Sequence, residues 1–193
     1  MSRECRFKEM CIGLLAACLI PGMAVAAPER AEFGREHASR EARHIADWVV
    51  HSADNRDQRA GNARRLPFVV VDKRDARVFV FDAEGRLRGA AAALLGLATG
   101  DHAVPDIGTR KLSSIRREER TTPAGRFVAA LGNSTRGEDV LWVDYDGAVS
   151  MHRVIGTRDR LRRLASPTSR DNRISYGCIN IPARFYETVV QPS

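Results

Sequence analysis

The sequence predicts a mainly β domain with short helices, and two hairpin patterns carry this prediction. Val- and Phe-rich runs flank the polar segment Lys73-Arg74-Asp75-Ala76, and a second pair of runs flanks Asp144-Tyr145-Asp146-Gly147. Runs of β-branched and aromatic residues joined by tight polar turns are typical of antiparallel sheets. Residues 67–193 therefore form the predicted domain. Residues 27–66 are charged and poor in β-branched residues, which predicts a helical extension and a linker.

The first residues have the layout of a secretory signal peptide. A basic start is followed by an apolar run from Cys11 to Ile20 and by the small-residue sequence Ala24-Val25-Ala26. This order is typical of a signal peptide cleaved after Ala26. The apolar run is too short to span a bilayer, which takes roughly 20 residues. Residues 1–26 are thus a predicted signal peptide, and the protein is expected in the periplasm or cell envelope. Lipid attachment at Cys18 is an alternative for the same segment.

Removal of the signal peptide gives Cys178 its significance. The chain has four cysteines, and Cys178 is the one that lies beyond the signal peptide. It has no partner for a disulfide within the mature chain, so the fold depends on a hydrophobic core. Two interpretations of the thiol are open at this point. It is either a reactive nucleophile or a buried side chain that acts as a small hydrophobe.

The extension contains one predicted helix, from Glu36 to Val50. The helix is predicted to be amphipathic, because one face carries Ala38, Ala42, Ile45 and Val49, with Trp48 beside them. Three histidines recur every seven residues along it: His37, His44 and His51. Residues seven apart in a helix are about 10.5 Å apart along its axis, too far for one metal ion to join. We therefore predict a solvated face there, followed by a polar linker over Asp54–Arg65.

The domain begins with strands at Pro67–Asp72 and Arg77–Asp82, which form the first hairpin. The next segment, Leu87–Ala98, fits a third strand by its position and a helix by its alanines. Gly100–Arg120 is long, polar and irregular, as lids and binding loops often are.

The second half of the domain follows the turn Thr122-Pro123-Ala124-Gly125. This turn leads into Arg126–Leu131, and Gly132–Gly137 is a predicted loop. The second hairpin pairs Val140–Val143 with Ala148–His152. A short helix is predicted at Arg158–Ala165. Pro182 fits the first residue of a final helix that ends at Val190.

The charge pattern argues against nucleic acid as a partner. The chain has a formal net charge of +7, but its basic residues are interleaved with Asp and Glu. It contains no helix-turn-helix, zinc-finger or aromatic-basic strand motif. A basic surface instead favours an anionic environment or substrate.

The candidate chemistry lies at two points in the sequence, His152 and Ser175-Tyr176-Gly177-Cys178-Ile179-Asn180. An unperturbed cysteine is only a few per cent ionised at neutral pH, so a nucleophilic thiol needs a base, and His152 is the best candidate. Gly177 permits a tight turn, in which the amides of Gly177 and Cys178 are expected to stabilise an oxyanion. Ser175 either orients the imidazole, binds substrate or stabilises the turn. Asn180 either positions a polar substrate group or is a satisfied loop amide.

These residues resemble the active-site signature of the L,D-transpeptidase family, the YkuD-type domain. That signature is a histidine followed by [Ser/Thr]-x-Gly-Cys-x-[Asn/Arg], and Thr122-Pro123-Ala124-Gly125-Arg126-Phe127 resembles a further TPxGxF segment of the domain. The resemblance covers residues 68–193. It implies a β-sandwich-like catalytic domain with Cys178 as nucleophile, His152 as general base and acid, and Gly177 in the oxyanion turn. We also predict substrate contacts at Ser175, Tyr176 and Asn180.

The implied reaction is acyl transfer on peptidoglycan stem peptides through a cysteine thioester. The terminal D-alanine is released, and an amine of a second stem or of a wall protein resolves the thioester. Hydrolysis by a cysteine carboxypeptidase or endopeptidase is the alternative among enzymes, and a non-catalytic wall-binding module is the alternative outside them. No cofactor or metal is needed by this mechanism.

The sequence departs from the family pattern at three places. Tyr176 occupies a position where many members have histidine, so a third catalytic side chain is not expected there. The Arg-rich segment from Arg158 to Arg163 indicates an insertion at the rim of the cleft. Members of the family also continue further beyond the cysteine, so either a closing strand is missing or the fold ends early.

Overall fold

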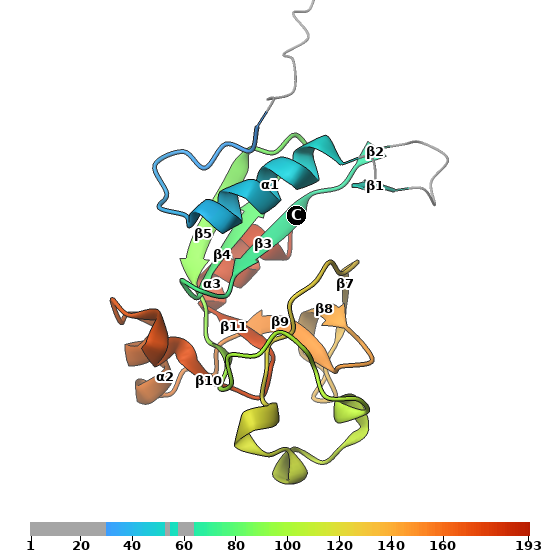
Figure 1. The fold of residues 1–193 in the computed structure, drawn as a ribbon, viewed down its shortest axis with the longest axis vertical. Coiled ribbons are helices and arrows are strands. Elements are labelled where there is room, and N and C mark those ends of the chain that lie inside the picture. The colour runs from blue at the N-terminus through green and yellow to red at the C-terminus, as the bar shows by residue number, and fades with distance from the viewer. Residues whose placement is uncertain (1–29, 53–54, 58–63) are drawn as a thin grey trace, which may run out of the picture.

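The structure is a computed structural model that describes residues 30–52, 55–57 and 64–193. The described residues form eleven strands and three short α-helices, which confirms the mainly β prediction (Figure 1). The predicted signal peptide and Cys18 lie outside the described residues. Within the described part of the chain, no helix has the length and apolar character needed to cross a membrane.

The first sheet is antiparallel, with strand order β3-β4-β5. Its strands are β3 (Phe68–Asp72), β4 (Arg77–Phe81) and β5 (Leu87–Ala92), so the first predicted hairpin is confirmed. The ambiguous segment begins as the strand β5. Gly89 in this strand lies so close to the C-terminal helix that a Cβ there would be only 2.9 Å from the Phe185 ring. The small residues of β5 thus let the C-terminal helix approach the sheet closely, and their helix propensity is overridden by packing.

Helix α1 (Arg40–His51) covers one face of this sheet (Figure 1). It begins later than the predicted Glu36, because Ser39 caps it by accepting a hydrogen bond of 3.0 Å from the amide of Ala42. The predicted apolar face is partly wrong. The buried residues of the helix are Ala42, Ala46 and Val50, while Ile45 and Trp48 are about half exposed. Small side chains bring the helix close to the sheet, and the larger ones extend beyond its edge. His37, His44 and His51 are all exposed, as the solvated-face prediction requires.

Two hydrophobic clusters lie on opposite faces of the first sheet. Alternate residues of β4 point to opposite sides, so Phe79 and Phe81 pack towards α1 while Val78 and Val80 pack towards the second sheet. The cluster that contains Val78 and Val80 also contains Met151, Ile179, Ile181 and Tyr186. The two sheets therefore share one core.

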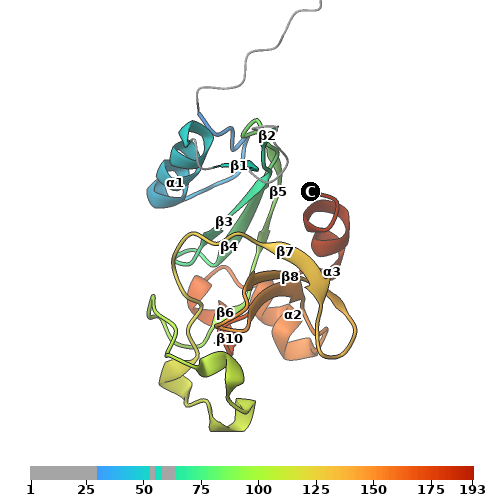
Figure 2. The same cartoon turned by 90° about the vertical axis from the view of Figure 1, so that its right-hand side faces the viewer.

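The second sheet has the strand order β11-β9-β8-β7. Its strands are β7 (Ala130–Asn133), β8 (Asp139–Asp144), β9 (Val149–Arg153) and β11 (Ile179–Ile181). The second hairpin, β8 with β9, is confirmed, and β11 adds to β9 in parallel. The predicted loop at Gly132–Gly137 begins too early, because β7 pairs with β8 from Ala130 and includes Gly132 and Asn133. In Figure 2 the strands of the second sheet lie below those of the first.

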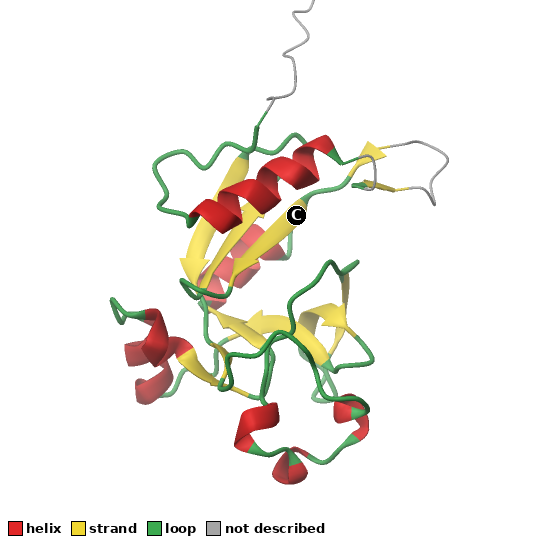
Figure 3. Ribbon diagram, in the orientation of Figure 1, coloured by secondary structure: helices red, strands yellow, loops and turns green. Residues whose placement is uncertain are grey.

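Two small strand pairs complete the β structure. β10 (Arg173–Ser175) pairs in parallel with β6 (Leu95–Gly96), which follows β5 in the chain, so the segment before Cys178 is joined to β6. β1 (Arg56–Asp57) pairs with β2 (Arg64–Arg65) within the predicted linker. Single helical turns at Ile107–Thr109, Leu112–Ser114 and Arg117–Glu119 interrupt the predicted irregular loop (Figure 3).

The last two helices lie near the predicted places. α2 spans Arg158–Leu164, and α3 (Ala183–Phe185) follows Pro182 and continues as a π-helical turn over Tyr186–Val190. Arg153 of β9 fixes this C-terminal segment. Its guanidinium donates to Asp139 and Glu187 at 2.9 Å each and lies 4.5 Å from the centre of the Tyr186 ring. Figure 2 shows α1 and α3 on opposite sides of the first sheet.

Candidate active site

The parallel pairing of β9 with β11 brings the two candidate catalytic residues together. Asn180 lies opposite His152 in this ladder and Ile179 opposite Met151, so Cys178, just before β11, lies beside Ser150 near the start of β9. The side chains of His152 and Cys178 are neighbours at this junction, and each shifts the pKa of the other. The thiol is unpaired and partly buried.

The contact made by Nδ1 of His152 determines which tautomer of the imidazole is present. Nδ1 lies 2.8 Å from the backbone carbonyl of Arg153. Because a carbonyl only accepts, Nδ1 carries a proton, and in the neutral ring Nε2 then has the free lone pair. The ring is thus held in the tautomer that accepts a proton from the thiol.

The surroundings of the pair favour its charged form. Burial raises the pKa of Cys178, but hydrogen bonds from His152 and Ser150 outweigh this effect and bring the pKa below its ordinary value. Burial likewise lowers the pKa of His152, but the hydrogen bonds to Cys178 and Arg153 outweigh it and raise the pKa. Ser150 Oγ lies 3.7 Å from Cys178 Sγ, and the thiol is 3.6 Å from the Ala148 carbonyl. Opposite shifts in the two groups favour a thiolate next to an imidazolium.

Gly177 adopts a backbone conformation that the turn requires. Its φ is +137°, and a Cβ there would lie 2.9 Å from the backbone oxygen of Thr121. Its amide donates to Ser175 Oγ at 3.1 Å. The expectation that both turn amides serve an oxyanion is therefore corrected, because this amide already has an acceptor. Only the Cys178 amide remains a candidate.

The substrate-binding roles predicted for Ser175 and Asn180 are also corrected. Their side chains are buried, at 4% and 2% exposure. Ser175 Oγ donates to the carbonyl of Cys178 at 2.6 Å, and Asn180 Nδ2 donates to the same carbonyl at 3.1 Å. Both residues thus hold the turn from within and have no surface towards a substrate.

Thr122 is a site residue that the sequence reasoning did not assign. Its buried hydroxyl accepts from the Gly96 amide at 2.8 Å and donates to the Gly177 carbonyl at 2.7 Å. It therefore connects strand β6 to the turn that carries Cys178. The TPAGRF segment was noticed in the sequence, but nothing local indicated this long-range contact.

Replacing Thr122 with valine is expected to lower the free energy of unfolding and to slow reactions of the thiol. Valine has nearly the same shape but leaves the buried amide of Gly96 and carbonyl of Gly177 without this partner, at about 1–3 kcal/mol for each group that stays unsatisfied. Denaturant unfolding and thiol alkylation measure the two effects. Thr188→Val is the matched control, because Thr188 is exposed and bonds only within its own helix. Equal unfolding free energies for the two variants would contradict the role of Thr122.

The rim next to the turn contains Tyr176 and Arg120. The Arg120 guanidinium lies 3.9 Å from the centre of the Tyr176 ring, and Tyr176 is 38% exposed. Tyr176 therefore remains a candidate for substrate contact. Just before Arg120, Glu119 is buried and accepts hydrogen bonds from Arg110 and Arg116, which lower its pKa to about 2. These hydrogen bonds join distant residues of the irregular segment Gly100–Arg120 to one another.

A groove of about 1340 Å³ lies between the two sheets, and it is not the site of the thiol. Val71 of β3 and Leu141 and Met151 of the second sheet line it. Because residues alternate along β9, Ser150 and His152 point to the other face of the sheet. The Cys178 site therefore opens on the face away from this groove.

Comparison with models of known protein families, with curated proteins and with solved structures finds no match. The argument for function accordingly depends on the chemistry of the site. The arrangement has a thiol of lowered pKa, a histidine in the tautomer of a base and a rigid turn around them. Together these can form and resolve a thioester.

Proposed function

We propose that the chain is a cysteine-dependent acyltransferase of the peptidoglycan layer, with the activity of an L,D-transpeptidase. The observation that carries the proposal is the pairing of Cys178 with His152, which lowers the pKa of the thiol, while the carbonyl of Arg153 lies 2.8 Å from Nδ1 of the imidazole. This arrangement suits proton transfer from Sγ to Nε2, and it is the requirement of a cysteine nucleophile.

The proposed reaction begins when Nε2 of His152 takes the proton of the Cys178 thiol. The thiolate attacks the carbonyl carbon of the third residue of a stem peptide, and the carbonyl oxygen becomes an oxyanion near the Cys178 amide. When the C–N bond breaks, the imidazolium returns its proton to the departing amine of D-alanine, which leaves a thioester on Sγ. An amine from a second stem, or from a wall protein, then attacks the thioester and releases the thiol.

The choice of peptidoglycan rests on the resemblance of this chain to L,D-transpeptidases. His152, the sequence from Ser175 to Asn180 and the TPAGRF segment occur in the order of that family. The mainly β fold and the placement of Thr122 against the turn are compatible with it. The signal-peptide pattern supports a place in the cell envelope.

The experiment incubates the mature protein with defined tetrapeptide muropeptides and identifies products by mass. Dimers joined between third residues support the proposal. Tripeptides without dimers indicate hydrolysis of the same acyl-enzyme, and the protein is then a carboxypeptidase. If the wild type leaves the muropeptides unchanged and forms no covalent adduct, the catalytic proposal fails and a wall-binding module is favoured.

A further inference from the structure

We propose that Arg160 is a positioning residue for Cys178, and that helix α2 is thereby a part of the active site. The proposal rests on the proposed function, in which the Cys178 thiol is the reacting group. It gives a residue-level role to the Arg-rich segment that the sequence placed at the rim of the cleft.

A chain of two hydrogen bonds connects Arg160 to the turn. Nη1 of Arg160 donates to Oδ1 of Asn180 at 2.7 Å, and Nδ2 of Asn180 donates to the carbonyl of Cys178 at 3.1 Å. An asparagine amide has its acceptor and its donors at opposite ends of one plane. By holding the oxygen, Arg160 therefore turns the N–H group towards Cys178.

The Cys178 carbonyl is held from two directions. Ser175 Oγ donates to it at 2.6 Å from within the turn, and Asn180 donates from β11. These two bonds fix the peptide plane that follows the thiol-bearing Cα. Without Arg160, the Asn180 amide is free to rotate, so one of the two supports is weakened while Ser175 remains.

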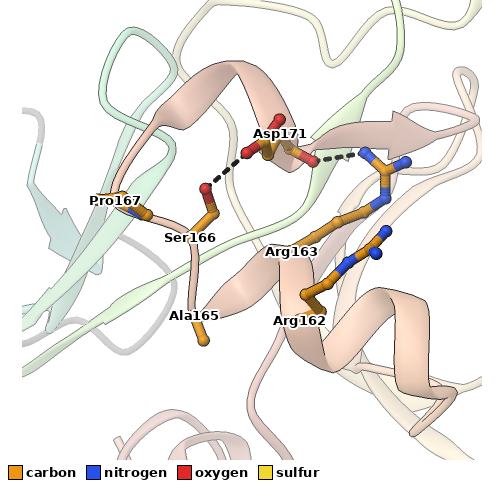
Figure 4. A pocket seen from close by; sticks show the side chains of 6 residues that line it. All are labelled: Arg162, Arg163, Ala165, Ser166, Pro167 and Asp171. Atoms are coloured by element: carbon orange, nitrogen blue, oxygen red, sulfur yellow. Dashed lines mark hydrogen bonds between the residues drawn. The ribbon is translucent and has the colours of Figure 1, made fainter.

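Hydrogen bonds hold helix α2 against the rest of the domain, so the position of Arg160 is held as well. Figure 4 shows the pocket of about 510 Å³ beside the helix, where Ser166 and Arg163 both reach Asp171. Ser166 Oγ donates to the Asp171 carboxylate at 2.6 Å, and Arg163 Nη1 donates to its backbone carbonyl at 2.9 Å. The next residue, Asn172, is buried and donates to the carbonyl of Ala93 at 3.0 Å. The helix is therefore tied to the strand region that precedes β6.

The test compares Arg160→Ala with the control Arg162→Ala. Both remove one arginine from α2, but the Arg162 guanidinium bonds only to the exposed Asp159 of its own helix. The readout is the rate at which iodoacetamide alkylates Cys178, measured as a function of pH. We expect Arg160→Ala to slow alkylation at neutral pH up to about 10-fold, because a rise of about one unit in the thiol pKa lowers the reactive thiolate fraction about tenfold. Its pH profile should move to higher pH, because the contact of the thiol with His152 is loosened. Arg162→Ala should match the wild type.

A double-mutant cycle with Asn180→Ala tests the route of the effect. If Arg160 acts through Asn180, then adding Arg160→Ala to Asn180→Ala produces no further loss. Independent, additive losses would overturn the proposal. If Asn180→Ala unfolds, Asn180→Ser replaces it in the cycle, since a serine hydroxyl is too short to join Arg160 to the Cys178 carbonyl. Thermal unfolding of each variant separates a loss of folding from a change in the thiol.

The failure of this inference and the failure of the proposed function are distinguishable. Equal alkylation rates and pH profiles for the wild type and Arg160→Ala overturn the inference, whatever the muropeptide result. If the wild type does not act on muropeptides but the alkylation cycle shows coupling, the positioning role is supported and the peptidoglycan substrate is wrong.

Discussion

Replacing Cys178 with alanine is expected to abolish both the covalent adduct and the transfer product. The thiol is the only group in the site that can form the thioester, and removal of a catalytic nucleophile costs roughly 10⁴-fold or more in rate. Intact-protein mass spectrometry after incubation with tetrapeptide muropeptide measures the adduct directly. We expect the mass of the wild type to increase by the acyl group and that of the variant to stay unchanged.

Cys178→Ser is the matched variant for this experiment. It keeps a hydroxyl at the same place, but this hydroxyl ionises far less readily than a thiol beside the same histidine. We expect the serine variant to be nearly as inactive as alanine, while its unfolding midpoint remains close to that of the wild type. An adduct of undiminished yield on Cys178→Ala would place the acyl group on another residue and remove Cys178 from the mechanism.

The hairpins were predictable because their signals are local. The turns at residues 73–76 and 144–147 stand between β-branched runs, and both hairpins form as the sequence indicates. The pairing of Cys178 with His152 was predicted from residue types. The geometry behind it, the parallel ladder of β9 with β11, has no local signal, because the two strands are joined across α2 and β10.

The errors in the predicted fold have one physical origin, which is packing between elements that are distant in the sequence. The alanines after Gly89 favour a helix but lie in a strand, where a Cβ at Gly89 would meet the Phe185 ring. Ile45 and Trp48 are apolar but half exposed, because α1 approaches the sheet on its alanines. No periodicity within either segment indicates what packs against it.

The roles of the polar site residues depend on contacts of the same kind. Ser175 and Asn180 were expected to face a substrate, yet both donate to the Cys178 carbonyl. Thr122 and Arg160 were not assigned, although they hold the turn from segments far away in the sequence. A motif thus indicated the candidate reacting residues, but only the three-dimensional structure shows which residues hold the turn around them.

Replacing His152 with alanine is expected to lower the rate of acyl transfer about 10²-fold to 10⁴-fold, the contribution typical of a general base. It is also expected to change the pH dependence of the thiol, and the sign follows from the structure. In the wild type, hydrogen bonds from His152 and Ser150 outweigh burial, so the pKa of Cys178 lies below its ordinary value.

Without the imidazole, burial remains while the largest opposing interaction is lost, so the pKa of Cys178 rises. Alkylation by iodoacetamide, which requires the thiolate, should therefore begin at a higher pH in the variant than in the wild type. His44→Ala is the control, because it removes an exposed histidine of α1 on the other side of the molecule from the second sheet. An alkylation profile of His152→Ala that coincides with the profile of His44→Ala would mean that His152 does not activate the thiol. A profile displaced to higher pH, together with the loss of transfer, would instead show that the proton of Cys178 passes to His152 before the thiolate attacks.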